Sequence, residues 1–437
     1  MGLSKRHRGA AAVAMAAVAV FASASACSED SDSGDDGQIT LTVDVFGDQG
    51  FGYEALYERY MEQHPNIKIE ERGKGFALND YNTRLTQWIA SSSGAGDIVA
   101  LEEGTIVQFK AQSAQFVNLL DYGAGAMEQD FLAWKWKQGQ TADGKQLIGL
   151  GTDIGSMAIC YRKDLFAKAN LPTDREAVGA LWPTWEKFIE TGKTYVAAEE
   201  STKFVDAATN FYNVVLMQVA GTGTGYTYFN TNEKFVLDSN PDIKAAWQLT
   251  VDMIDSDLSA GLRSFSDAWN TGFKQAQFAT IACPAWMTGV IKGQAGDDAA
   301  GKWDVAKAPG TGGNWGGSFL AVPKQSKHPK EAAELAKFLT GAEGQIEAFN
   351  KLGNLPSNPR ALQDPVIVDF KNEYFSDAPT GEIFAAGATS LKPVYLGPKN
   401  QAVRDEIENA LRSIEQEQRT ADQAWQDAVQ NGTNAGK

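Results

Sequence analysis

The stretch "ITLTVDVFGDQGFGYEALYERYMEQHPNIKIEE", residues 39–71, indicates the fold class of this protein. Residues 39–46 alternate apolar and polar side chains, which is typical of a β-strand. Residues 53–64 then have the periodicity of an amphipathic helix that Pro65 ends, and residues 67–71 read as a second strand. Consecutive strands joined by a helix pair in parallel, so this order predicts an α/β protein.

The same rhythm continues downstream, with a helix expected at 80–91 and a strand at 97–101. The later segments alternate less regularly. We expect strands at 146–151, 156–166, 280–286 and 318–323, helices at 185–198, 211–220, 242–254, 268–278, 330–339 and 343–352, and a C-terminal helix with Val403, Ile407, Ala410, Leu411 and Ile414 on one face.

The N-terminus has the layout of a secretory signal. Lys5, Arg6 and Arg8 precede an uncharged, alanine-rich run that is too short for a comfortable transmembrane helix. Small residues before Cys27 fit signal-peptidase cleavage and also the end of a bacterial lipobox. We therefore expect residues 1–26 to be a signal peptide and Cys27 to be lipidated, with simple secretion as the alternative.

Residues 27–38 are rich in serine, glycine and acid and contain too little apolar surface to fold. They predict a flexible tether that holds a folded domain at the extracellular face of the cell membrane through the lipid. The formal charge is -16, and loss of the three basic signal residues makes it -19. Such an acidic surface repels phosphate backbones and argues against nucleic acid as a partner.

About 400 residues remain, which is enough for two or three domains. No glycine- or serine-rich linker divides them, so we expect the chain to pass between two lobes more than once, near 145–155 and 315–325. The expected division is 39–150 mainly in lobe 1, 151–315 mainly in lobe 2, and 316–437 as the hinge return and C-terminal helices shared between lobes.

Two further cysteines, Cys160 and Cys283, lie in apolar stretches. An oxidising compartment favours a disulfide between them, and two buried thiols are the alternative. Outside the signal the only histidines are His64 and His328, and no cysteine or histidine pair has ligand spacing. We expect no metal site and no cofactor.

Most catalytic signatures are incomplete. The "GKT" at 192–194 lacks the earlier glycine of a phosphate-binding loop, and Ser318 lacks the second glycine of a nucleophile elbow. Glu102, Glu103 and Asp153 follow predicted strands, so a secreted glycoside hydrolase with paired carboxylates is a possible alternative. Solvated loop acids and ligand contacts are the other interpretations of these residues.

Three tryptophans have unusual surroundings. Trp315 stands in "GTGGNWGGS", Trp286 ends an apolar strand, and Trp269 opens a helix in "SFSDAWNTGF". An indole among glycines has few local neighbours to pack against, so its flat face is available to a ligand. Sugars suit such a site, because a pyranose has an apolar face that stacks on indole and hydroxyls that pair with carboxylates and amides.

A series of motifs then resembles a known family. From Ile39 to about Leu362 the chain is similar to the carbohydrate class of extracellular solute-binding proteins, the maltose-binding-protein-like receptors of ABC importers, and most closely to actinobacterial sugar-binding lipoproteins, including those for cello-oligosaccharides. The motifs, in this order, are "YEALYERYMEQHPNIKIE", "GDIVALEEG", "CYRKDLFAKANLPT", "WPTWEKFIETGK", "FKQAQFATIACPAWM", "GGSFLAVPKQSKHPKEAAELAKFL" and "GNLPSNPRAL".

The resemblance implies a two-lobed periplasmic-binding-protein-like fold with a multi-strand hinge and a ligand cleft between the lobes. The second acid in "GDIVALEEG" and Tyr161-Arg162 in "CYRKDLF" depart from the frequent pattern of the family. Position by position, the implied ligand contacts are Asp48, Gln49, Glu102, Glu103, Asp153, Trp286 and Trp315, to which the aromatic pattern adds Trp269.

Together these observations predict a monomeric, non-catalytic receptor that binds an oligosaccharide, with cello-oligosaccharides favoured, and delivers it to the membrane subunits of an ABC importer. Two alternatives stay open. The first is the secreted glycoside hydrolase, and the second is a receptor for peptides or another solute.

Overall fold

The computed structural model describes residues 37–437, of which 39–437 form one compact unit. The expected signal peptide, Cys27 and nearly all of the expected tether lie outside the described residues. Among the helices of the described part, none combines the length and the apolar character needed to cross a bilayer.

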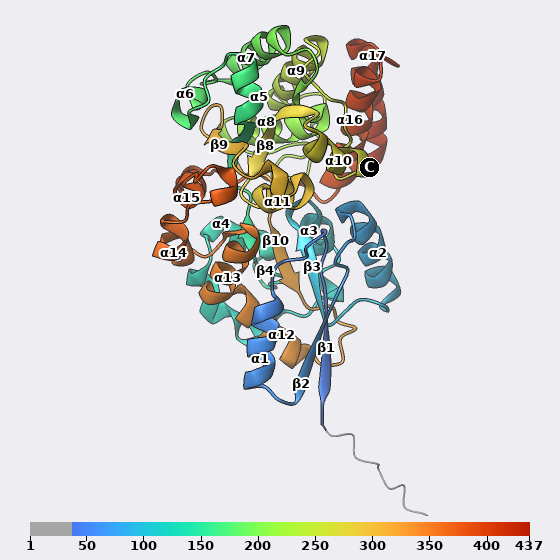
Figure 1. The fold of residues 1–437 in the computed structure, drawn as a ribbon. Coiled ribbons are helices and arrows are strands. Elements are labelled where there is room, and N and C mark those ends of the chain that lie inside the picture. The colour runs from blue at the N-terminus through green and yellow to red at the C-terminus, as the bar shows by residue number, and fades with distance from the viewer. Residues whose placement is uncertain (1–36) are drawn as a thin grey trace, which may run out of the picture. The chain divides into compact units, whose positions relative to one another are not determined.

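Two larger sheets organise the unit and lie in different halves of it (Figure 1), and a third sheet has only two strands. In the first sheet β1 pairs in parallel with β2 and β3, which confirms the parallel pairing predicted from residues 39–101. A strand from much later in the chain, β10, joins this sheet antiparallel to β3. The strand order is β2 (Ile67–Arg72), β1 (Ile39–Asp44), β3 (Ile98–Glu102), β10 (Ser318–Ala321) and β4 (Leu150–Gly151).

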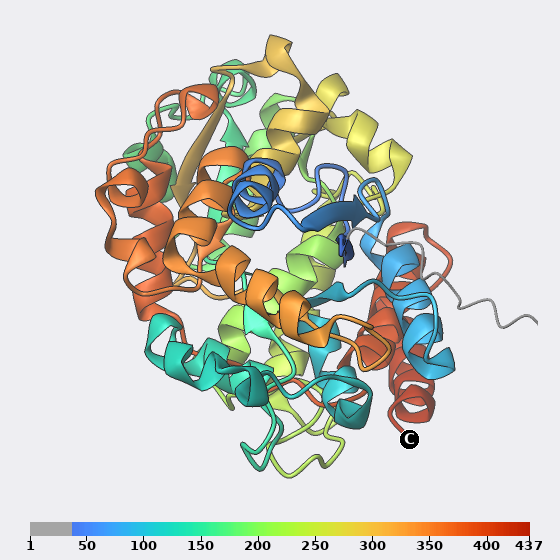
Figure 2. The same cartoon turned by 90° about the horizontal axis from the view of Figure 1, so that it is seen from below.

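Helices from early and late parts of the sequence cover the first sheet. Tyr60 of α1 contacts Phe338 of α12, with ring centroids 5.1 Å apart, and α1 lies beside α12 and α13 when the molecule is seen from below (Figure 2). The core here is built of side chains from the strands and from α1 (Glu54–Gln63), α2 (Leu78–Ser91), α3 (Glu103–Lys110), α4 (Ala133–Gly139), α12 (Pro329–Thr340) and α13 (Ala342–Leu352).

The second sheet is mostly antiparallel. Its central strand β6 pairs antiparallel with β8 and β9, while β7 pairs in parallel with β8. Cys160 of β6 and Cys283 of β8 form a disulfide with their Cα atoms 5.4 Å apart. The order is β7 (Lys203–Val205), β8 (Phe278–Pro284), β6 (Met157–Arg162) and β9 (Trp303–Lys307).

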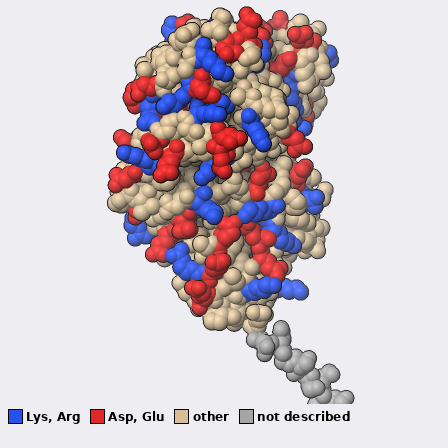
Figure 3. Space-filling model, viewed as in Figure 1, with Lys and Arg blue, Asp and Glu red and all other residues tan. Residues whose placement is uncertain are grey.

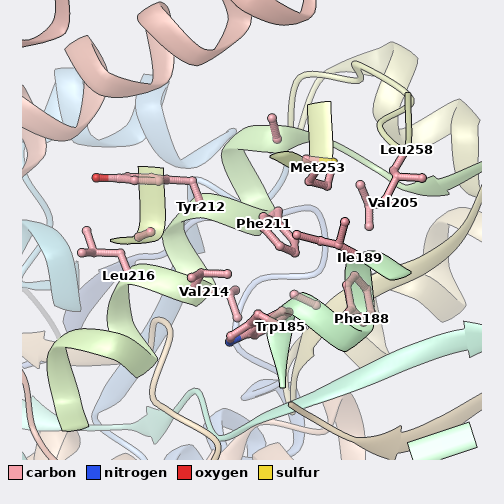
Figure 4. Packing of buried hydrophobic residues seen from close by; sticks show 14 of the residues in the cluster. Trp185, Phe188, Ile189, Val205, Phe211, Tyr212, Val214, Leu216, Met253 and Leu258 are labelled. Atoms are coloured by element: carbon pink, nitrogen blue, oxygen red, sulfur yellow. The ribbon is translucent and has the colours of Figure 1, made fainter. Parts of the chain in front are cut away.

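Aromatic packing dominates the core of this half. Phe188 contacts both Trp185 and Phe211, at ring centroid distances of 5.5 and 6.0 Å, and Figure 4 shows these rings together. The helices of this half are α5 (Lys163–Lys168), α6 (Arg175–Gly179), α7 (Trp185–Ala198), α8 (Ala208–Thr222), α9 (Pro241–Asp255), α10 (Asp267–Gln275), α11 (Met287–Ala295), α14 (Pro365–Val368), α15 (Thr380–Ser390), α16 (Asn400–Glu415) and α17 (Ala421–Ala435).

The chain passes between the two sheets more than once. It leaves the first sheet after β4, runs through β5 (Asp153–Ile154) into β6, and returns between β9 and β10. A third segment, β11 (Leu355–Pro356), pairs antiparallel with β5. Several backbone segments therefore run side by side where the two sheets are connected.

Several expected element boundaries were wrong. The strand expected at 156–166 ends at Arg162, whose guanidinium binds Asp164 at 2.7–2.8 Å as α5 begins. The helix expected at 268–278 ends at Gln275, because Ala276 is left-handed and the buried Phe278 starts β8. The strand expected at 280–286 ends at Pro284, and only 150–151 of the expected 146–151 pair as a strand.

Short 3₁₀ helices connect the larger elements. They are Ser113–Gln115, Leu119–Tyr122, Ala124–Asp130, Asp297–Ala299, Ala361–Gln363 and Glu373–Phe375.

On the surface, Lys and Arg side chains are interspersed among Asp and Glu on the face shown in Figure 3.

Candidate functional site

A cavity lies between the β3–α3 junction on the side of the first sheet and helices α8 and α16 on the side of the second. It measures about 390 Å³ when the part open to solvent is counted, but only about 30 Å³ is wide enough for the centre of a water molecule. That is room for about two waters, so the cavity is narrow. Its lining comprises Glu102, Glu103, Gly104, Asn213, Leu216, Met217, Thr227, Tyr228, Trp315, Gly316, Leu396, Asn400 and Arg404.

Glu102 occupies the last position of β3 and caps α3. Its carboxylate accepts a hydrogen bond from the backbone N–H of Gly104 at 2.7 Å, which satisfies one of the free donors at the helix N-terminus. Burial raises the pKa of Glu102 to about 7, the charge of Glu103 adds to the rise, and the facing Arg404 opposes it.

Glu103, the first residue of α3, is almost completely buried. Its carboxylate accepts hydrogen bonds from the amide of Gln138, at 2.6 Å, and from the amide of Asn314. Burial raises the pKa of Glu103 as well. Because the strand ends between these two acids, both reach the cavity, although neighbours within one strand point to opposite faces.

The opposite wall carries a cation held by a carboxylate. The Nε of Arg404 on α16 lies 3.2 Å from Glu408, one helical turn away, and the amide of Asn213 on α8 donates to the same carboxylate at 2.9 Å. Arg404 and Asn213 both line the cavity, so donors on this wall face the acceptors at Glu102 and Glu103.

Trp315 forms an apolar part of the wall, and the half-buried Trp286 packs beside it. Their ring centroids are 5.5 Å apart, and the indole N–H of Trp286 donates to the backbone carbonyl of Trp315 at 3.2 Å. Gly155 packs so closely against this segment that a Cβ there would lie 1.8 Å from the Trp315 oxygen. The position of Trp315 therefore depends on glycine at 155.

Trp269 does not reach the cavity. It is fully buried, and its indole N–H donates to the carboxylate of Asp206 at 2.7 Å. The position of Trp269 at the start of a helix did not predict this partner, because Asp206 lies 63 residues earlier in the sequence. In this arrangement Trp269 offers no face to a ligand and instead supports its aromatic neighbours.

Asp153 lies beside the cavity, in the segment that connects the sheets. It accepts hydrogen bonds from Thr152, at 2.6 Å, and from the backbone of Ser318, at 2.9 Å. The fully buried Lys135 lies near it, with Nζ 4.0 Å from the ring centroid of Phe319 and without a hydrogen-bond partner in the described chain. Burial lowers the pKa of Lys135, and the charges of Glu103 and Asp153 oppose that shift.

Asp48 and Gln49 lie at a different part of the boundary between the two halves. Both are exposed in the loop after β1, and Asp48 accepts a hydrogen bond from Gln294 of α11 at 2.6 Å. The Gln49 amide lies against Gly293 of the same helix. Neither residue is among those that line the cavity.

The structure thus brings Glu102, Glu103 and Trp315 together, with Asp153 and Trp286 beside them but outside the lining of the cavity. It adds polar residues that the sequence did not single out, Asn213, Asn400 and Arg404. Within the described chain, no group of His, Cys, Asp and Glu side chains is arranged to hold a metal ion. The walls thus combine carboxylates, amides, a guanidinium group and an indole.

The sequence profile of the bacterial extracellular solute-binding protein family matches residues 55–373. The chain belongs to this family. Like the solved structure of an extracellular solute-binding protein of family 1, this solute-binding protein has the periplasmic-binding-protein-like fold; the two are 38% identical with a TM-score of 0.79, over 91% of this chain and 100% of the other. The expected fold class is confirmed.

Two more distant relatives carry ligand names. The arabinooligosaccharide-binding protein of Bacillus subtilis (strain 168) is 23% identical, over 90% of this solute-binding protein and 91% of the relative. A transporter-associated binding protein from B. animalis subsp. lactis Bl-04, solved with beta-1,6-galactobiose, is 22% identical with a TM-score of 0.76, over 91% of this chain and 99% of the other.

Proposed function

We propose that this protein captures an oligosaccharide in the cavity between its two halves and delivers it to the membrane subunits of an ABC importer. The observation that carries the proposal is the facing arrangement of the walls. Acceptors at Glu102 and Glu103 belong to the side of the first sheet and donors at Arg404 and Asn213 to the side of the second, and the Trp315 indole lines the same cavity. A sugar ring offers hydroxyls that both donate and accept, and a C–H face that stacks on indole.

The distant relatives support a saccharide of more than one ring, since one is named for arabinooligosaccharides and another was solved with beta-1,6-galactobiose. The motif series of the sequence favours cello-oligosaccharides. The common element is a chain of neutral sugar rings.

Ligand entry requires the walls to separate, because the cavity has room for only about two waters. We infer that 39–150 and 151–315 act mainly as two lobes, that 316–437 returns through the hinge, and that the ligand binds the closed form better than the open one. Since the ligand would touch both walls, its binding energy would favour closure.

The arrangement of acids favours binding over hydrolysis. A glycoside hydrolase needs two carboxyl groups on either side of one glycosidic bond. Glu102 and Glu103 belong to one wall, while the facing wall presents Arg404, whose side chain cannot serve as a general acid.

The sequence also supports membrane attachment through a lipid on Cys27. We expect Cys27→Ser to release the folded protein into the medium of cells that otherwise retain it. Equal retention of both proteins would contradict the lipid anchor and leave the sugar site untouched.

The decisive experiment is calorimetry on the chain from Gln38 onward, which contains the whole compact unit. The panel holds cellobiose, cellotriose, maltose, xylobiose, beta-1,6-galactobiose, an arabinotriose and monosaccharides. We expect at least one oligosaccharide to bind with a micromolar Kd, equivalent to about 8 kcal/mol, and no product to form over hours. A panel without any binding would refute the proposal, and turnover at catalytic protein levels would favour the hydrolase.

A further inference from the structure

An exposed aromatic ring continues the row of tryptophans away from the cavity. The rings of Phe265 and Trp286 lie 6.2 Å apart with an angle of 27° between their planes, and those of Trp286 and Trp315 lie 5.5 Å apart. Trp315 lines the cavity, so the row runs from the cavity wall to Phe265. The Phe265 side chain is 40% exposed, whereas most large apolar side chains of the described chain are buried.

The backbone of Phe265 is unusual as well. Its φ is +62°, in the left-handed region that a bulky side chain rarely adopts. A strained backbone that holds an apolar ring in solvent is not explained by packing of the core, and such outliers are concentrated at ligand-binding positions.

Trp269 holds the Phe265 ring in place. Trp269 packs against Phe265 at a centroid distance of 4.9 Å and is itself fixed by its hydrogen bond to the buried Asp206. The backbone N–H of Leu262 in the same loop donates to the Asp206 carbonyl at 3.1 Å. Both the loop and the ring are therefore tied to the end of β7, which gives Phe265 the rigidity that a preformed binding surface needs.

We propose that Phe265 is the outermost contact for an oligosaccharide chain that starts in the cavity, continues over Trp286 and ends on this ring. The inference rests on the proposed function. The steps between the three rings are comparable with the length of one sugar residue, so the site would recognise chain length, and its ligand class would be linear oligosaccharides of three or more rings.

The test is calorimetry with a homologous series of one to five sugar rings, made from whichever linkage the wild-type protein binds. We expect Phe265→Ala to weaken binding of three or more rings at least fivefold and to leave one and two rings unchanged. Phe265→Tyr keeps a flat ring and should retain long-chain affinity, whereas Phe265→Leu keeps apolar bulk and should lose it.

Val366→Ala is the matched control, because Val366 is 47% exposed on α14 and belongs to no aromatic row. Thermal unfolding of each variant verifies folding. An equal loss for short and long chains, or no loss for any, would overturn the inference while the proposed function stands. Unchanged binding with impaired import would instead assign Phe265 to contact with the importer. Absence of sugar binding by the wild-type protein would refute both.

Discussion

The indole N–H of Trp286 donates a hydrogen bond to the backbone carbonyl of Trp315, at 3.2 Å. This bond joins the end of β8 to the segment that returns from the second sheet to β10 in the first. The backbone of a residue that lines the proposed site is thus held by a side chain 29 positions away, and this backbone belongs to a segment that connects the two halves. Several consequences of these contacts can be measured.

Trp286→Ala and Trp315→Ala should each weaken sugar binding at least tenfold. A ring stacked on an indole removes roughly 120 Å² of apolar surface from water, worth about 3 kcal/mol, and about 1.4 kcal/mol already corresponds to a tenfold change. Calorimetry measures the loss. Trp425→Ala, on the C-terminal helix α17, is the control and should bind normally. Unchanged affinity in both site variants would exclude the site.

Arg404→Met should weaken sugar binding by about 10 to 100 times, because a hydrogen bond to a charged group contributes roughly 1.5–3 kcal/mol. Arg412→Met is a close control. Both arginines lie near Glu408, at 3.2 and 3.8 Å, but only Arg404 lines the cavity. Equal losses in the two variants would mean that the effect comes from Glu408 and the helix.

The ligand-free protein should become less stable as the pH rises from 5 to 8. Burial raises the pKa of Glu102 and that of Asp206 to about 7, from ordinary values of 4.5 and 3.8. A carboxyl whose pKa is raised by folding favours the folded state fully below its unfolded pKa and loses this contribution as the pH passes its folded value.

Urea unfolding at pH 5.5 and pH 8 measures this difference. Glu102→Gln and Asp206→Asn should each reduce it by about 1–3 kcal/mol, since one pKa unit corresponds to about 1.4 kcal/mol. A pH dependence identical to that of the wild-type protein in both variants would show that these acids do not carry it.

The disulfide should matter more for stability than for binding. It closes a loop of 123 residues between β6 and β8, so its removal should lower the free energy of unfolding by about 2–4 kcal/mol. The variant Cys160→Ala/Cys283→Ala tests this in urea. Reductant should destabilise the wild-type protein and leave the variant unchanged, and a lack of effect on the wild-type protein would contradict the prediction.

Local pattern was sufficient for the parallel strands β1, β2 and β3 of the first sheet, and it singled out three residues that line the cavity, Glu102, Glu103 and Trp315. The alternation in 39–46 indicates a strand and the helical period of 53–64 indicates a helix, without any knowledge of distant contacts. The glycines on both sides of Trp315 distinguish it from the other tryptophans. Boundaries such as Arg162 to Lys163 were missed because a buried strand and the first turn of a buried helix are equally apolar.

The wall that contains Arg404 and Asn213 could not be predicted from local sequence pattern. Arg404 lies on the polar edge of an amphipathic helix, which looks the same in sequence whether it meets solvent or a cavity. Its role depends on α16 packing near α3, about 300 residues earlier. Trp269 was misjudged for a related reason, since the carboxylate that buries its N–H comes from a distant strand end.

Asn314 has contacts on three sides of the connection between the sheets. Its amide accepts from the backbone of Gly155, which leads out of the first half, and donates to Gly316, which leads back, and to Glu103 in the cavity wall. A molecule that changes the environment of that carboxylate would therefore act on the backbone that connects the two halves through a single side chain. Ligand binding and the conformational response to it would then depend on the same amide group. We expect Asn314→Ala to keep ligand binding but to weaken the conformational change that an importer would recognise.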